Sequence, residues 1–225
     1  MAIERYVCQQ TGVARLEEIK TWMEENASDY FTGFDIITED ASANVRCLRC
    51  HIGEVSQVEI RNEAGSNSVN DVDIILSDSS HAMDPNRPCA INVLYKTSCG
   101  IFFMATNNTL MNFFVSKTDD GKVAIAGTEY TSYDSSGHTG GRTFIVIPEL
   151  PTTLREIVPA KATSEWKSLV TTPAEKTTPV PLCFSTGQYT SGLFRMVFFK
   201  YPATRCEFTM NNVKYVTDGV FALKE

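Results

Sequence analysis

The sequence predicts a mainly β protein: an antiparallel β-sandwich or barrel with one N-terminal amphipathic helix and a Pro/Thr-rich extended arm. Three observations predict this class. One early segment repeats its apolar residues at helical spacing. Beyond residue 30 most of the chain consists of short β-branched and aromatic runs separated by Gly, Asn, Asp and Ser. A later segment is rich in Pro and Thr.

The helix is predicted over residues 11–25, where Leu16, Ile19 and Trp22 belong to an apolar stripe between Glu and Lys residues. We expect the Thr11 side chain to cap its N-terminus and Asn26 to end it. The apolar stripe must cover a sheet or a neighbouring subunit.

Strands follow the helix. They are predicted at residues 34–38, 45–52, 57–61, 72–76, 91–96 and 101–105, with a polar loop at 63–70. The middle of the chain predicts a hairpin of residues 110–117 and 122–130, because Gly121 supplies the positive φ of a tight turn. A Gly- and Ser-rich loop at 133–141 and a strand at 142–147 complete a three-stranded meander.

Six prolines and many threonines over residues 148–181 favour extended backbone, with short helical turns near Leu154 and Trp166. Composition allows a linker between lobes or an arm lying across a neighbour; we favour the arm, because Trp166 and Leu169 need apolar surroundings. The β pattern then resumes at 193–200 and 205–210. Tight turns are predicted at Asn211-Asn212 and Asp218-Gly219, around strands at 213–216 and 220–223.

The predicted organisation is therefore a helix plus β domain at 1–147, an arm at 148–181, and C-terminal hairpins at 182–225 packing on the same core. Aromatic doublets such as Phe102-Phe103 and Phe113-Phe114 lie within predicted strands, where adjacent side chains face opposite ways. Both faces of that sheet are then apolar, and one short helix is too small to cover them. A second sheet or another subunit must then help to cover them, which favours a sandwich or barrel that associates with copies of itself or with other chains.

Composition excludes some function classes. The formal net charge of −7, with no basic run, argues against nucleic acid as a partner. Acidic residues look scattered, in pairs such as Glu17-Glu18 and Asp119-Asp120, as on a solvated surface. The N-terminus lacks the pattern of a secretory signal and no apolar run reaches membrane-spanning length, so synthesis in the cytoplasm is expected, with the seven cysteines reduced.

One segment matches a named motif: Cys47-Leu48-Arg49-Cys50-His51 fits the C-x-x-C-H pattern of covalent haem attachment. The motif lies in a predicted strand without a signal peptide, so two buried strand cysteines are the preferred interpretation. A zinc site on Cys47, Cys50 and His51 would need Cys89 or Cys99 as fourth ligand, at a spacing typical of no common zinc module. We predict no metal and no cofactor.

No catalytic residue is predicted either. The other histidines are His81, in the triad-like run Asp78-Ser79-Ser80-His81, and His138, in the Gly-rich run 137–142 that precedes a strand rather than a helix. Solvated loops are the preferred interpretation of both. A pair of carboxylates brought together by the fold, as in glycoside hydrolysis, stays open because sequence spacing does not reveal it.

The C-terminal segment 212–223, Asn-Val-Lys-Tyr-Val-Thr-Asp-Gly-Val-Phe-Ala-Leu, resembles the closing hairpin of small structural proteins of tailed bacteriophages. The Thr- and Asn-rich β style and the extended arm are similar to tail, neck and capsid-accessory proteins as well. This resemblance implies a non-enzymatic virion protein that self-assembles or bridges other virion subunits, with no membrane and no small-molecule ligand. The alternatives are a carbohydrate- or receptor-binding β module and a β-scaffold hydrolase with carboxylate catalysis.

Overall fold

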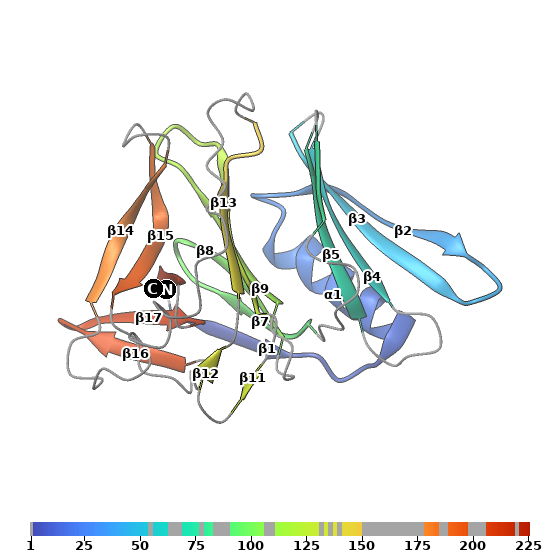
Figure 1. The fold of residues 1–225 in the computed structure, drawn as a ribbon, viewed down its shortest axis with the longest axis horizontal. Coiled ribbons are helices and arrows are strands. Elements are labelled where there is room, and N and C mark those ends of the chain that lie inside the picture. The colour runs from blue at the N-terminus through green and yellow to red at the C-terminus, as the bar shows by residue number, and fades with distance from the viewer. Residues whose placement is uncertain are drawn as a thin grey trace.

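A computed structural model of the chain describes residues 2–53, 56–62, 69–76, 79–82, 91–105, 111–130, 133–134, 137–138, 141–149, 178–184, 189–197, 206–218 and 221–225. The protein is mainly β, with antiparallel sheets stacked in layers (Figure 1). This confirms the predicted fold class.

Three larger sheets make up the described part of the chain. The central sheet has the order β1-β7-β8-β9-β10-β13, with strand bounds Glu4–Val7, Ile91–Lys96, Gly100–Ala105, Met111–Lys117, Val123–Tyr130 and Gly141–Val146. The N-terminal sheet has the order β2-β3-β4-β5-β6, with bounds Thr32–Asp40, Val45–Ile52, Ser56–Asn62, Val69–Leu76 and Ser79–Ala82. The C-terminal sheet has the order β14-β15-β18-β17-β16, with bounds Thr178–Phe184, Tyr189–Val197, Phe221–Lys224, Val213–Thr217 and Cys206–Met210.

The central sheet is covered on both faces from within the chain. On one face Phe103 and Phe113, opposite each other on β8 and β9, stack at 4.2 Å between ring centroids and belong to a core shared with α1 and the N-terminal sheet. On the other face Phe102 and Phe114 stack at 3.9 Å in a core shared with the C-terminal sheet. The doublets thus face opposite ways, as predicted, and the chain's own layers cover both faces where the side chains of this sheet are described.

The helix α1, Gly12–Asn26, lies between the central and N-terminal sheets (Figure 1). Its buried residues are Leu16, Ile19, Trp22 and Met23, as the spacing predicts. Thr11 is at the N-cap position, but its side chain makes no capping hydrogen bond, so that part of the prediction is wrong. The second turn of the helix is joined to β1 through Glu18, described below.

The turns follow their predicted chemistry. Gly121, at φ +87°, closes the β9–β10 hairpin, and Asn211 and Asn212, at φ +51° and +62°, close β16–β17. Two positive-φ residues in a row are typical of the type I′ turn that suits strand twist. The segment that resembles phage proteins contains β17 and β18, which pair as an antiparallel hairpin.

Several strands appear where the sequence predicts none. They are β1 at the N-terminus, β6, and the small pair β11 (Tyr133–Asp134) and β12 (Gly137–His138), within the segment expected to be a loop. β14 begins at Thr178, inside the range predicted as an arm, and pairs with β15. Residues 150–177, including the turns expected near Leu154 and Trp166, lie outside the described residues.

Candidate functional site

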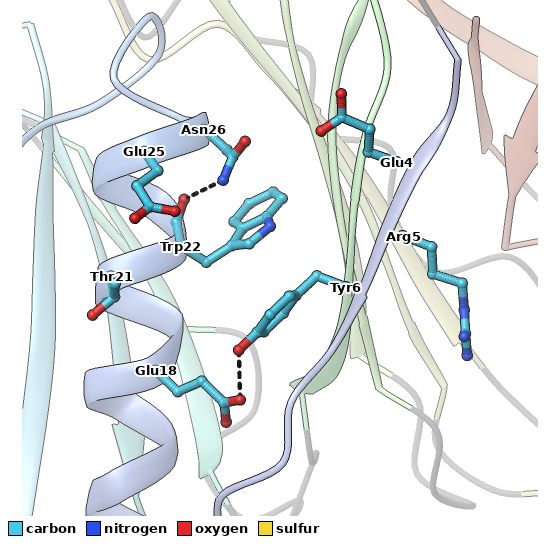
Figure 2. Close-up of a pocket in the computed structure, with 8 residues that line it drawn as sticks. All are labelled: Glu4, Arg5, Tyr6, Glu18, Thr21, Trp22, Glu25 and Asn26. Carbon is cyan, nitrogen blue, oxygen red and sulfur yellow. Dashed lines mark hydrogen bonds between the residues drawn. The ribbon is translucent and has the colours of Figure 1, made fainter.

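A groove of about 530 Å³ lies between β1 and α1. Its lining residues are Glu4, Arg5, Tyr6, Glu18, Thr21, Trp22, Glu25 and Asn26. Figure 2 shows Tyr6 and Trp22 reaching from the two elements into the space between them, while Arg5 points away from the helix. Five of the lining residues are exposed and only one, Trp22, is buried, so the site is an open groove with one aromatic residue in its floor.

Glu18 joins the two walls of the groove. Its carboxylate accepts hydrogen bonds from the Tyr6 hydroxyl at 2.6 Å and from the backbone amides of Gln9 and Gln10 at 2.8–3.0 Å. Burial would raise the pKa of Glu18, but these hydrogen bonds outweigh it and hold the pKa below its usual value. The same hydrogen bond raises the pKa of Tyr6 to about 12. Near neutral pH Glu18 is therefore ionised and Tyr6 is neutral.

The aromatic residues of the groove differ in exposure. Tyr6 is 36% exposed, whereas Trp22 is 8% exposed and packs edge-on against Phe103 of the central sheet, 6.1 Å between ring centroids. Asn26, in the last turn of α1, donates to the Trp22 carbonyl and accepts from Lys96 of β7 at 3.2 Å. The floor is thus fixed by the core, and the exposed wall is the Tyr6 ring.

The groove carries more negative than positive charge. Within the described part of the chain, no ion pair joins Glu4, Glu18 or Glu25 to a Lys or Arg side chain. Arg5 donates instead to the Tyr95 hydroxyl at 3.2 Å, outside the groove. Lys96 reaches one end of it through Asn26. Three carboxylates beside an exposed aromatic ring suit a cationic group.

The formal charge of the chain is concentrated in its first 40 residues. Residues 1–40, which contain β1, α1 and β2, hold nine Asp or Glu and three Lys or Arg, a formal charge of −6 out of −7 for the chain. The acidic residues are therefore not evenly scattered, contrary to the expectation from the sequence. We call residues 1–40 the acidic segment. α1 contacts β2 and forms the groove with β1. The carboxylates of β2 lie beside arginines of the neighbouring strands, since Arg49 is opposite Asp35 and Arg61 pairs with Glu39.

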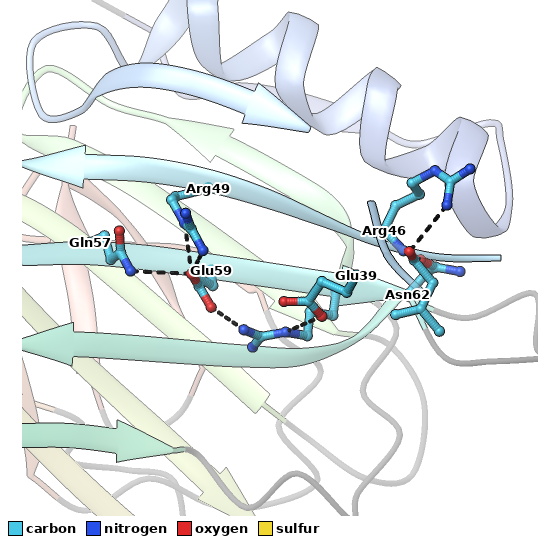
Figure 3. Close-up of polar contacts among 8 residues, drawn as sticks. Glu39, Arg46, Arg49, Gln57, Glu59 and Asn62 are labelled. Atoms are coloured by element: carbon cyan, nitrogen blue, oxygen red, sulfur yellow. Dashed lines mark hydrogen bonds and ion pairs between the residues drawn. The ribbon is translucent and has the colours of Figure 1, made fainter. Parts of the chain in front are cut away.

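A second group of charges lies on the N-terminal sheet, on the face away from α1 (Figure 3). Glu59 of β4 is 1% exposed, and its carboxylate accepts from Arg49 at 2.7–2.8 Å, from Gln57 at 3.2 Å and from Arg61. Arg61 also pairs with Glu39 of β2 at 2.8 Å. The charges of this network are neutralised inside the chain. Its ion pairs join the neighbouring strands β2, β3 and β4.

The network also contains a cluster of three potential metal ligands, two of which are carboxylates. Potential ligand atoms of Glu39, Cys47 and Glu59 lie within 4.8 Å of one another. Arg61 forms ion pairs with both carboxylates of the set, however. A bound cation or a proton-transferring carboxylate would have to displace this guanidinium, so the arrangement fits a salt-bridge network better than a metal or catalytic site.

The C-x-x-C-H segment lies in β3, as predicted. Side chains three residues apart in a strand point to opposite faces of the sheet, so its two cysteines are separated. Cys50 belongs to the core with α1, whereas Cys47, three residues away, lies on the opposite face beside Arg61. Burial raises the pKa of both thiols, that of Cys47 to about 12. His51 is on the Cys47 face, where its ring lies against Gly33. One metal ion could not be held by both cysteines without rearranging the sheet.

The other candidates from the sequence are placed only by the strands and turns that the structure describes. Ser79, Ser80 and His81 belong to β6, and His138 belongs to β12, whereas Asp78 and Cys89 lie outside the described residues. Cys99 is half-buried in the β7–β8 turn, where its carbonyl accepts from Ser116 at 2.5 Å. These positions are explained by the turns and strands they occupy.

Comparison with known proteins adds no relative: no protein-family model, no curated protein and no solved structure matches the chain. Within the part of the chain that the structure describes, no helix has the length and apolarity needed to span a membrane.

The groove was missed from the sequence. Its helix wall was predicted, but its other wall is β1, a four-residue strand for which no pattern was noted. One signal was available in the sequence, because counting charges by segment shows the acidic residues of the first 40 positions.

Proposed function

We propose that the protein is a non-enzymatic assembly component that joins neighbouring subunits through its acidic segment. The observation that carries this proposal is the charge distribution: residues 1–40 hold a formal charge of −6, and the remaining 185 residues are close to neutral. A segment with an excess of negative charge is complementary to a basic surface and repels the same segment of another copy.

This repulsion favours one kind of contact. In a two-fold interface the same patch meets itself, so two acidic segments would face each other. A head-to-tail contact brings the acidic segment of one subunit against a different, basic surface of the next. Head-to-tail contacts generate rings or filaments, as expected of a protein that assembles in many copies.

The packing supports a polar rather than an apolar contact. Both faces of the central sheet are covered by the chain's own layers, and Tyr6 is the only large apolar side chain more than about a third exposed among the residues whose side chains are described. Association would then depend on charge and on salt concentration.

A non-enzymatic role is supported by the ionisation of the carboxyls. In the described part of the chain, the carboxyls whose pKa departs from its usual value are Glu18, Asp40 and Asp120, and each is lowered by hydrogen bonds. A general acid in glycoside hydrolysis needs a raised pKa. The buried thiols, with raised pKa values, are likewise poor nucleophiles.

The setting we propose is a virion: the tail, neck or capsid of a tailed bacteriophage, reached after synthesis in the host cytoplasm. Its support is the resemblance of segment 212–223 to phage structural proteins. Other virion proteins are then partners besides the chain itself, and the net charge argues against nucleic acid.

Light scattering of the full chain over a series of protein and salt concentrations tests this function. We expect an oligomer whose mass rises with protein concentration and falls between about 50 and 500 mM NaCl, since screening weakens exposed charge pairs. A monomer under every condition would contradict self-assembly.

The second candidate function is carbohydrate binding, favoured by one observation, the presence of Tyr6 and Trp22 in the same groove. Sugar rings stack on exposed aromatic faces. Trp22 is only 8% exposed, so Tyr6 alone offers such a face, and a glycan array would decide the matter.

A further inference from the structure

The geometry points to the groove between β1 and α1 as the receptor for a lysine or arginine side chain of the neighbouring subunit, placed against the Tyr6 ring among Glu4, Glu18 and Glu25. This inference rests on the proposed function and names the chemistry of its contact.

The first step of the argument concerns the charges that line the groove. Glu4 and Glu25 are exposed, and their carboxylates form no hydrogen bond or ion pair with the described residues. Glu18 is held ionised by Tyr6 and two backbone amides, which supply no formal charge. The cations close by are Arg5, which is turned toward Tyr95, and Lys96, which is bonded to Asn26 at one end. The middle of the groove therefore favours an added positive charge.

The second step concerns shape and rigidity. A volume of about 530 Å³ is ample for one long side chain with its hydration water. Tyr6 and Glu18 are fixed to each other across the groove, and Trp22 is fixed against Phe103, so the walls are set before a ligand enters. The exposed Tyr6 ring offers its face to a cation, and the carboxylates surround the charged end.

The third step separates a protein side chain from a free amine. The groove is open and mostly exposed, so it would enclose only part of a small ligand. It lies within the acidic segment, whose formal charge of −6 attracts a partner that carries several basic residues. A partner that carries several basic residues gains from both features, whereas a small amine gains from the groove alone.

The probe for the test is a hexalysine peptide with blocked termini, added to the full chain at about 20 mM NaCl, where screening is weak. The protein carries Trp166→Phe, which leaves Trp22 as its only tryptophan and therefore as the fluorescent reporter of the groove. We expect a saturable change in Trp22 fluorescence, and none with the same peptide acetylated on every side-chain amine.

Variants locate the binding site. Glu25→Gln is expected to weaken binding about threefold and Glu4→Gln with Glu25→Gln about tenfold, because each exposed ion pair contributes a few-fold. Glu17→Gln is the matched control: the same charge change on the same helix, at an exposed residue that does not line the groove. It should retain affinity within about twofold.

Several results would overturn the inference. They are equal loss in Glu17→Gln and Glu25→Gln, equal response to the acetylated peptide, or tighter binding of spermidine or of a glycan than of the peptide. The double variant could bind the peptide as tightly as the wild type while the chain still forms salt-sensitive oligomers. The assignment of the groove as the receptor would then be wrong, and the assembly function would stand. If the peptide binds in the groove but the chain is always monomeric, the groove does receive a basic side chain and the proposal of self-assembly is wrong.

Discussion

Two groups of carboxylates near the N-terminus are arranged in opposite ways. On the N-terminal sheet, Glu59 is buried and paired with Arg49 and Arg61, and Arg61 also neutralises Glu39 (Figure 3). In the groove, Glu4 and Glu25 are exposed and unpaired among the described residues (Figure 2). Charges matched within the chain stabilise the fold, and charges left unmatched at a preformed groove are available to a partner. Mutations of the two groups should therefore have different consequences.

The largest effect is expected for Glu59→Gln. It removes the shared partner of two arginines, and we expect the free energy of unfolding to fall by about 2 to 3 kcal/mol, at the low end for a broken buried pair because the Arg49 side chain is 34% exposed. Urea unfolding measures this. Glu25→Gln is the matched change in the groove, and its free energy of unfolding should stay within about 0.5 kcal/mol of the wild-type value. Equal losses in the two variants would remove the distinction between the groups.

Tyr6→Phe tests the link between the walls of the groove. The variant keeps the ring and removes the hydroxyl that donates to Glu18 at 2.6 Å, so we expect a loss of about 1 kcal/mol in the free energy of unfolding. Peptide affinity should change less than it does in Glu25→Gln, because the ring and the carboxylates remain. A loss of binding with unchanged stability would mean that the hydroxyl itself contacts the ligand.

The parts of this comparison that sequence could reveal are the local ones. Periodicity locates α1 and its buried face, and turn chemistry locates Gly121 and the Asn211-Asn212 turn, because neighbouring residues determine these features. The pairing of β1 with β7 brings together residues 90 positions apart, such as Arg5 and Tyr95, and no local pattern encodes it. The groove exists only because of that pairing.

The same limit applies to the central sheet. The doublets at Phe102-Phe103 and Phe113-Phe114 correctly indicate two apolar faces. Which layer covers each face depends on where β15, β17 and β18 return in space, and composition is silent on this. Association with other subunits therefore stays a prediction, while the layers on both sides of the doublets come from the chain itself.

Acid titration should show a smaller effect at Glu18. Its pKa is lowered on folding, so its contribution to stability is complete above the usual value of 4.5 and is lost as pH falls through the folded pKa. The pKa of Tyr6 is raised to about 12, so its contribution is complete below 10 and is lost as pH rises toward 12. The free energies of unfolding of wild type and Tyr6→Phe should thus differ by a constant amount near neutral pH and converge at low and at high pH. Urea unfolding across pH measures the difference, and a difference that persists at low pH would contradict the role of ionised Glu18.

The last prediction is that zinc has no effect at the N-terminal sheet. Cys47 and Cys50 lie on opposite faces of β3, and Arg61 pairs with the carboxylates beside Cys47. Any ligand that binds the folded state at micromolar affinity would raise its stability at millimolar concentration. We therefore expect the melting temperature of the reduced chain to be unchanged by added zinc, and elemental analysis to find none bound. A rise that disappears in Cys47→Ala would show that the cation displaces Arg61, and the network would then be a metal site rather than a link between strands.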